Sequence, residues 1–375
     1  MASFTKRGKT WTYIVSRYTD GKYDPIRKGG FRTKKEAQVA AAEVEANLSK
    51  GIVPHLKPEP FNEYFKSWLE LYKTNIGKNT RERYINTLNT IDDEFGGKPI
   101  QDIKRKEYQQ FLNEYGKTRS KETVRKLNTH IRACVKDAID EGIISKDFTR
   151  KAVITGLAPK KASEKHINYD ESKLLLNLAI KKINEIDDTM KKLPIYIILL
   201  GLTSGMRFGE MVGLTRKDFN FSNNTINIDK TWGYTKKMHE GFGPTKNEQS
   251  ERVIKMDPKT MGIFKIMFNN TPENIHRLVF YNQTSKYKVV SNATVNATLK
   301  SLLSELKVEP ISVHGLRHTH ASVLIYQRKV SINYISERLG HKDIETTIKD
   351  YSHVLKELRE EDQLDTANIM NAMYA

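Results

Sequence analysis

Alternating apolar and polar residues near the N-terminus predict a small antiparallel sheet followed by a helix. Residues 11–16 alternate as a strand does, a turn is expected over residues 19–22, and further short strands are expected at residues 23–27 and around Phe31. Thr33 stands three residues before Glu36, which is the spacing of a capping box. An alanine-rich helix is therefore predicted from there to Gly51, where it can cover one face of the sheet.

Apolar residues then recur at helical spacing and predict a compact four-helix bundle over residues 58–157. A proline-bounded linker over residues 54–60 precedes the bundle, and a second linker over residues 158–163 follows it. The four predicted core stripes are Phe61, Phe65, Trp68, Leu69 and Tyr72; Tyr84, Leu88 and Ile91; Tyr108, Phe111, Leu112 and Tyr115; and Val124, Leu127, Ile131, Val135 and Ala138.

Residues 165–375 are predicted to be mainly helical, with a small strand-rich insertion. Residues 225–229 alternate apolar and polar positions, and residues 252–256 are expected to pair with them across a polar connection. The longest uncharged run, residues 193–206, is continuously apolar only over residues 195–200, which is too short to span a membrane. The pattern as a whole indicates a multidomain α+β protein with three segments, residues 1–57, 58–157 and 165–375.

The charge of the chain indicates a polyanionic partner. Lys and Arg number 63 against 45 Asp and Glu, which gives a formal net charge of +18 over 375 residues. Residues 1–57 hold 12 basic and five acidic residues, with Trp11, Tyr13 and Tyr18 among them. This segment is interpreted as a DNA-binding sheet, the alternative being a solvated face over a small core. Double-stranded DNA is the expected partner.

The remaining composition favours the cytoplasm. The sequence begins MASFTKRGKTW, without the apolar core of a secretory signal, and Cys134 is the single cysteine. No paired histidines stand at metal-ligand spacing beside a carboxylate, so a structural zinc site is not expected.

Three short motifs carry candidate chemistry in the C-terminal segment. TSGMRFGEM supplies Arg207 and Glu210, HGLRHTHAS supplies His314 and Arg317, and LGHKDIETTIKDYSHV supplies His341 and Tyr351. The planar guanidinium of arginine is suited to the charge that develops on a phosphate under attack. His314 and Arg317 are three residues apart and should share one helical face. A tyrosine hydroxyl, with a reference pKa near 10, must lose its proton during attack or be paired with cations.

Each of these residues has an ordinary structural interpretation when taken alone. Arg207 and Glu210 would form a surface ion pair, and Glu210 could orient a neighbouring group. His318 and His320 are interpreted as packing residues or as residues behind the site. Among the other tyrosines, Tyr326 and Tyr334 are expected in the core, and Tyr374 lies at the extreme end.

The combination of motifs resembles the tyrosine recombinase (phage integrase) family, whose signature is Arg, Lys, His-x-x-Arg, His or Trp, and Tyr. The resemblance implies catalytic roles for Arg207, Lys246, His314, Arg317, His341 and Tyr351, with a lysine on a β-hairpin that protonates the departing 5′ oxygen. Lys246 fits the T-K-x(3)-S-x-R pattern with Ser250 and Arg252, while Lys230, Lys236 and Lys237 remain alternatives.

The resemblance also implies an architecture and a set of partners. Residues 1–57 look like an arm-type DNA-binding domain, residues 58–157 like a SAM-like core-binding bundle, and residues 165–375 like the catalytic domain. Such enzymes form a 3′-phosphotyrosyl intermediate without ATP or metal, act as tetramers, and can use an excisionase and a host DNA-bending protein. The tail with Leu355, Leu358, Leu364, Ile369 and Met370 could dock on a neighbouring subunit or pack in its own. The rival functions are a type IB topoisomerase and a non-catalytic DNA-binding regulator.

Overall fold

The protein is described here as a computed structural model over residues 2–19, 22–49, 58–158 and 166–374. The chain divides into two compact units, Met1–Pro159 and Lys160–Ala375, each with hydrophobic clusters of its own. The predicted turn at Asp20 and Gly21, the helix end at Gly51, residues 54–57 of the first linker and residues 159–163 of the second lie outside the described residues. The three predicted domain boundaries therefore stay predictions. No helix in the described ranges is long and apolar enough to cross a membrane.

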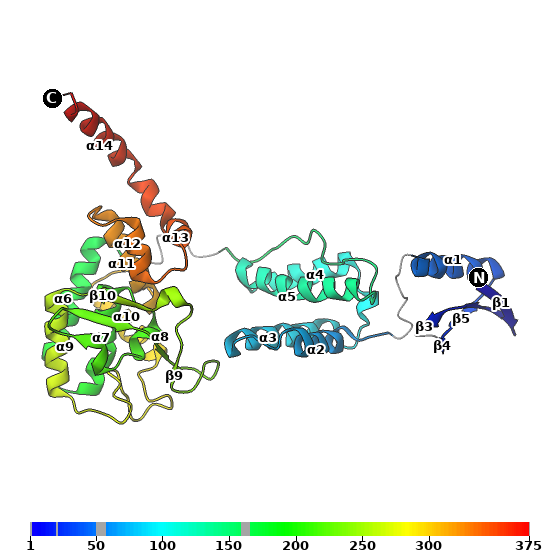
Figure 1. Ribbon diagram of the computed structural model, residues 1–375, viewed down its shortest axis with the longest axis horizontal. Coiled ribbons are helices and arrows are strands. Elements are labelled where there is room, and N and C mark those ends of the chain that lie inside the picture. The colour runs from blue at the N-terminus through cyan, green and yellow to red at the C-terminus, as the bar shows by residue number, and fades with distance from the viewer. Residues whose placement is uncertain (1, 20–21, 50–57, 159–165, 375) are drawn as a thin grey trace. The chain divides into compact units, whose positions relative to one another are not determined.

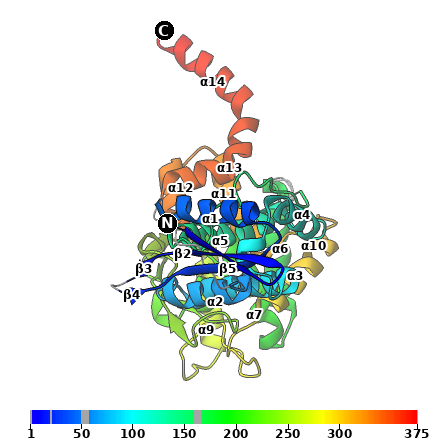
Figure 2. The ribbon, with the colours of Figure 1, turned by 90° about the vertical axis from the view of Figure 1, so that its right-hand side faces the viewer.

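The N-terminal sheet has three antiparallel strands in the order β1-β2-β5, and α1 packs across it (Figure 2). Its elements are β1 (Ala2–Arg7), β2 (Thr10–Val15), β3 (Tyr18–Thr19), β4 (Lys22–Tyr23), β5 (Ile26–Phe31) and α1 (Lys34–Ser49). Strand β1 was not predicted, because it is mostly exposed and carries little apolar alternation. The two short strands expected at residues 23–27 and Phe31 are instead mainly one strand, β5, with β3 and β4 forming a separate small hairpin.

The predicted four helices of the bundle are present. They are α2 (Phe61–Tyr72), α3 (Lys78–Phe95), α4 (Arg105–Gly116) and α5 (Lys121–Asp140). Their apolar stripes form one core, in which Phe61 and Phe65 are fully buried and the Trp68 indole donates to Asp137 at 2.6 Å. The prediction was wrong for Tyr72, which is 49% exposed and donates its hydroxyl to Glu141 instead of entering the core.

The C-terminal unit is built round a helix that is apolar on every side. Within α7, residues 193–201 are all buried, as expected for a helix that other elements surround. Helices α6, α10 and α11 pack against it (Figure 1). The helices of this unit are α6 (Tyr169–Glu185), α7 (Thr189–Ser204), α8 (Phe208–Val212), α9 (Pro258–Asn270), α10 (Asn292–Glu305), α11 (Val313–Tyr326), α12 (Ile332–Leu339), α13 (Ile344–Glu357) and α14 (Arg359–Ala372).

Two small antiparallel sheets interrupt these helices. Their strands are β6 (Phe219–Asn220), β7 (Thr225–Ile228), β8 (Thr231–Trp232), β9 (Phe242–Gly243) and β10 (Arg252–Lys255). The predicted pairing is confirmed, because β10 pairs with β7 in the register Arg252 to Ile228, and β6 adds a third strand. The hairpin of β8 and β9 forms the second sheet.

The chain ends in α14, which points away from the rest of the C-terminal unit (Figure 1). Its first turn is tied to the end of α11, because Arg328 pairs with Asp362 at 3.0 Å and with Asp365 at 2.7 Å. Leu358 is buried just before α14, whereas Leu364, Ile369 and Met370 are exposed. The side chain of Leu355 lies outside the described residues.

Candidate active site

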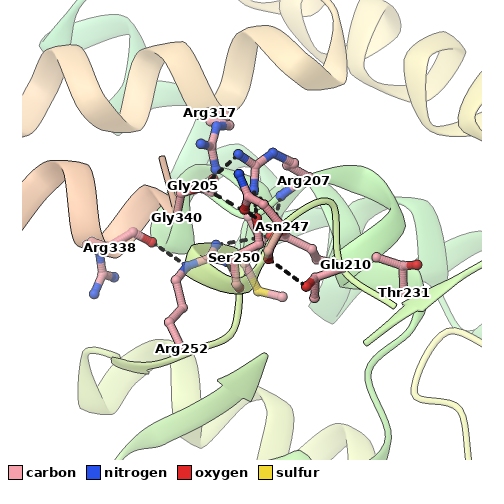
Figure 3. Close-up of polar contacts among 12 residues, drawn as sticks. Gly205, Arg207, Glu210, Thr231, Asn247, Ser250, Arg252, Arg317, Arg338 and Gly340 are labelled. Carbon is pink, nitrogen blue, oxygen red and sulfur yellow. Dashed lines mark hydrogen bonds and ion pairs between the residues drawn. The ribbon is translucent and has the colours of Figure 1, made fainter. Parts of the chain in front are cut away.

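Arg207 lies in a turn between two helices that fixes the direction of its side chain. Gly205 ends α7 in the left-handed conformation (φ 70°), and Arg207 is the residue before α8. Its Nη1 donates to Glu210 Oε1 at 2.8 Å and to Ser250 Oγ at 3.2 Å, and its Nη2 donates to the Gly340 carbonyl at 2.9 Å (Figure 3). Three segments far apart in the sequence therefore hold one guanidinium.

Glu210 is buried behind Arg207 and joins it to a second arginine. Its side chain is only 1% exposed, and its Oε2 accepts from Arg252 Nη2 at 3.0 Å (Figure 3). Burial alone would raise the pKa of Glu210, but Arg252 and Arg207 lower it below its usual value. The carboxylate therefore stays charged and compensates two cations, the partly buried Arg207 and the nearly buried Arg252. The sequence motif predicted that Glu210 pairs with Arg207, but not that Glu210 is buried.

Arg317 is almost fully buried on α11 and has an unused donor. Its Nη1 donates to the Gly205 carbonyl at 2.9 Å, while its Nη2 is buried without a hydrogen-bond partner within the part of the chain that the structure describes. Burial, and next the charge of Arg207, lower the pKa of Arg317 to about 9, so the group remains a cation at neutral pH. A buried cation with an unfilled donor is a place where an anion would be stabilised.

The two predicted histidines lie near these guanidiniums. His341 follows Gly340, which ends α12 in the left-handed conformation (φ 66°), and its Nδ1 is 2.7 Å from Thr347 Oγ1. Burial, then Arg317 and Arg207, lower the pKa of His341 to about 3, so its ring is neutral at pH 7. The pKa of His314 is also lowered, first by partial desolvation of its ring and then by Arg317 and Arg207.

Tyr351 lies at a break in α13. Its backbone (φ −114°, ψ 15°) is not helical, although the helix continues on both sides of it. The side chain is 1% exposed and packs in a cluster with Ile325, Ile335 and Leu339. Burial raises the pKa of Tyr351, and the positive charge of Arg317 opposes that rise.

His318, interpreted from sequence as a packing residue or a residue behind the site, contacts the hydroxyl of Tyr351. Its Nδ1 is 3.2 Å from Tyr351 Oη. The signal for this contact was in the sequence, because His318 is four residues after His314 and must share its helical face. The sequence does not show that α13 packs against that face of α11.

His320 has the structural role predicted for it. Its Nε2 accepts from Arg338 Nε at 3.0 Å, so its Nδ1 carries the proton and donates to the Leu202 carbonyl at 2.9 Å. Burial lowers the pKa of His320 to about 3. The ring thereby joins the end of α7 to α12 behind the two arginines.

The lysine candidates differ in their surroundings. Lys246 is exposed between β9 and β10, and its charge is among those that lower the pKa of His314. Lys230 is bound instead to Asp218 at 2.7 Å and to Asp229 at 2.8 Å. Lys236 and Lys237 lie in the turn between β8 and β9.

The expectation that Tyr326 and Tyr334 belong to the core was wrong. Tyr326 is 47% exposed and Tyr334 is 42% exposed, because the apolar stripes of α11 and α12 are narrower than the sequence pattern suggests. Tyr374 is almost fully exposed at the end of the chain. Across the described ranges, no three His, Cys, Asp or Glu side chains gather as metal ligands.

Comparisons with known proteins match all three segments. Residues 165–357 match the phage integrase family, residues 60–115 match the SAM-like N-terminal domain of phage integrases, and residues 3–48 match an arm DNA-binding domain. The integrase of Staphylococcus phage L54a is 26% identical over 357 residues, which cover 89% of this chain and 95% of the relative. A XerC-like tyrosine recombinase of Caldanaerobacter subterraneus is 26% identical over 383 residues, 94% of this chain and 95% of the relative.

The fold is similar to that of the Tn1549 transposon integrase, solved over its residues 82–397 in complex with transposon right end DNA. The two superpose with a TM-score of 0.64 at 17% identity, over 80% of this chain and 99% of that one.

Proposed function

The chain belongs to the phage integrase family of tyrosine recombinases, and from that premise we propose that it integrates and excises a mobile element by cutting and rejoining DNA. The observations that support this most are that Arg207 binds the Gly340 carbonyl next to His341, that Arg317 binds the Gly205 carbonyl two residues before Arg207, and that the charge of Arg317 opposes the raised pKa of the buried Tyr351. The relatives named as a phage integrase and a transposon integrase favour a mobile element over a chromosomal substrate.

In the proposed reaction, Tyr351 attacks a phosphate of the DNA backbone. The Oη–P bond forms and the P–O5′ bond breaks, which leaves a 3′-phosphotyrosyl enzyme and a free 5′ hydroxyl. Arg207, Arg317, His314 and His341 donate hydrogen bonds to the nonbridging oxygens as charge develops on them. Rejoining is the same reaction in reverse with another 5′ hydroxyl, so no ATP or metal is needed.

Lys246 is proposed to protonate the departing 5′ oxygen. Its exposed position and its effect on the pKa of His314 are consistent with a mobile ammonium at the edge of the site. Lys230 is the weaker candidate, because a proton donor held by two carboxylates is less acidic and less free to move.

Both parts of the first unit are proposed to bind double-stranded DNA. The bundle carries a groove between α3 and α5 that is lined by Arg83, Asn86, Asn89, Arg119 and Lys126, side chains suited to phosphates and base edges. The N-terminal sheet is proposed to hold separate arm-type sites. A basic chain of net charge +18 should also associate with the nucleoid of a bacterial cytoplasm.

The active assembly is proposed to be a homotetramer on two paired duplexes, with an excisionase and a host DNA-bending protein as accessory factors. The exposed apolar side chains of α14, among them Leu364, Ile369 and Met370, support a role for this helix in contacts between subunits. A covered apolar face in the assembly would explain why these side chains lack partners within the described part of their own unit.

The decisive experiment uses a nicked DNA substrate that traps the covalent intermediate. The wild-type protein should form an adduct with its attachment site, and Tyr351→Phe should form none. Absence of an adduct with the wild-type protein would favour a non-catalytic regulator. Joining of two attachment sites would then separate a recombinase from a topoisomerase, which relaxes supercoils without exchanging partners.

A further inference from the structure

The hydroxyl of Tyr351 has one hydrogen-bond partner among the described residues, and that partner is His318. The distance from Tyr351 Oη to His318 Nδ1 is 3.2 Å. His314 is not in hydrogen-bond contact with the phenol in the described residues; its ring lies against His318 instead, at 4.9 Å between centroids.

The three rings form a continuous row from the exposed to the buried side of the site. His314 and His318 are four residues apart on α11, and their rings meet edge to face at 87°. The rings of His318 and Tyr351 are 5.7 Å apart at 60°. His318 is therefore fixed between the exposed histidine and the phenol, with one nitrogen directed at the hydroxyl.

A phenol in this position needs a proton acceptor close to it. Tyr351 is covered by apolar side chains, and an apolar environment disfavours the tyrosinate form. Arg317 favours the anion but cannot take a proton, because it is already protonated. A neutral imidazole can accept the proton, since the unperturbed pKa of histidine, near 6.5, leaves most of it unprotonated at neutral pH.

We propose that His318 is the general base that accepts the proton of Tyr351 during DNA cleavage. The hydroxyl donates to His318 Nδ1 while the proton of the imidazole is on Nε2. As the Oη–P bond forms, the Oη–H bond breaks and its proton moves to Nδ1, which gives an imidazolium. The P–O5′ bond breaks at the other side, and the 5′ oxygen takes its proton from Lys246. In rejoining, His318 returns the proton to the phenolate of Tyr351.

This assignment leaves His314 to bind the phosphate. It also explains why two histidines stand at this spacing in HGLRHTHAS, one on each side of Arg317 in the sequence. The inference rests on the proposed function, because it requires Tyr351 to be the nucleophile.

The test combines two variants of His318 with two substrates. His318→Phe keeps a ring of similar size without an acceptor nitrogen, and His318→Asn keeps a hydrogen-bonding group near the position of Nδ1 without a basic nitrogen. One substrate is the ordinary nicked DNA, and the other has sulfur in place of the bridging 5′ oxygen. A thiolate leaves without a proton, so this second substrate removes the need for a general acid but not for a general base.

Both His318 variants should form the adduct at least about 100-fold more slowly than wild type on both substrates, which is the usual contribution of a general base. Lys246→Ala, the matched comparison, should be slow on the oxygen substrate and recover on the sulfur substrate. Melting temperature and DNA affinity show which variants are folded, and should His318→Phe fail to fold, His318→Asn decides.

Two results would overturn the inference while leaving the proposed function intact. One is cleavage by His318→Asn at the wild-type rate, because a hydrogen bond to the hydroxyl would then suffice without a base. The other is recovery of a His318 variant on the sulfur substrate, which would assign it to the leaving group. An adduct formed by Tyr351→Phe would instead refute the proposed function itself.

Discussion

Glu210 holds Arg207 at 2.8 Å with one carboxylate oxygen while its other oxygen accepts from a second buried arginine, Arg252, at 3.0 Å. The guanidinium of Arg207 therefore owes its direction to a carboxylate that no solvent reaches. Loss of the negative charge would leave the nearly buried Arg252 and the partly buried Arg207 without compensation.

Glu210→Gln should therefore lose both stability and cleavage. We expect a loss of about 3 kcal/mol in the free energy of unfolding, typical of a broken buried pair, and at least a tenfold slower adduct formation in the folded fraction. Thermal melting and the nicked-substrate assay measure the two effects. Glu185→Gln is the control, since it removes an exposed pair with Lys181 at 3.6 Å and should change neither. A fully active, equally stable Glu210→Gln would contradict this role.

Arg317→Ala should abolish cleavage and leave most of the DNA affinity. The unfilled Nη2 is proposed to bind one phosphate, whereas affinity should be spread over the many phosphates that all three segments are proposed to contact. Adduct formation and equilibrium binding at a stated salt concentration test this. A parallel collapse of binding and cleavage would show that Arg317 supports the fold more than the reaction.

Thr347 should matter because it fixes the ring of His341. Thr347 is fully buried, and its Oγ1 is 2.7 Å from Nδ1, so the other nitrogen is directed away from it. Thr347→Val keeps the shape and removes the hydroxyl, and we expect about tenfold slower cleavage with a stability loss of about 1 kcal/mol. Thr347→Ser should restore the cleavage rate. If Thr347→Val and Thr347→Ser slowed cleavage equally, packing and not the hydrogen bond would explain the role of Thr347.

His320 should make the C-terminal unit sensitive to acid. Its pKa is about 3 in the folded chain, against 6.5 for an unperturbed histidine, so the unfolded chain binds the extra proton between these values. Stability should therefore fall as pH drops from 6.5 toward 3, by at most about 1.4 kcal/mol per pH unit from this residue. His320→Gln can keep both hydrogen bonds without titrating, and its melting temperature should fall less steeply with pH. If the melting temperature of His320→Gln fell as steeply with pH as that of the wild type, His320 would not be the cause of the acid sensitivity.

Arg328 should control how firmly α14 is held at its base. It pairs with Asp362 and Asp365 and donates to the Leu358 carbonyl at 3.0 Å. Arg328→Ala should speed amide hydrogen exchange in residues 359–372, while the melting temperature changes little because exposed pairs contribute less than about 1 kcal/mol. High salt should loosen α14 in the wild-type protein in the same way. Equal exchange in both proteins would show that Arg328 does not hold the helix.

The sequence was most informative where local spacing carries the structure. The four helices of the bundle and the pairing of residues 252–255 with 225–228 follow from patterns of a few residues. Of the capping box predicted at Thr33, the bond from the Glu36 N–H to Thr33 Oγ1 is present, whereas the Glu36 carboxylate accepts from the Arg32 N–H. Gly205 and Gly340, which precede Arg207 and His341, end α7 and α12 in the left-handed conformation, as glycine commonly does at a helix end.

The misses have a common physical reason. Helical spacing shows that side chains share a face, but it does not show which neighbour covers that face. Tyr326 and Tyr334 were predicted to be buried but are exposed. His318 was not expected to contact the hydroxyl of Tyr351. The contact of Glu210 with Arg252 spans 42 residues and forms only when β10 is in place. The strand β1 has too little apolar surface to be visible in the sequence.

The break in α13 at Tyr351 has a consequence for selectivity. A phenol that is covered by Ile325, Ile335 and Leu339 cannot react with a duplex that merely collides with the protein. Cutting would require a preceding conformational step that opens Tyr351 to DNA and leaves its hydrogen bond to His318 in place, and a helix already interrupted at the nucleophile can turn there without unwinding a full turn. The protein would then discriminate an attachment site from other chromosomal DNA in two steps, first by binding affinity and then by exposure of the tyrosine. Random encounters with the host genome would leave no nicks.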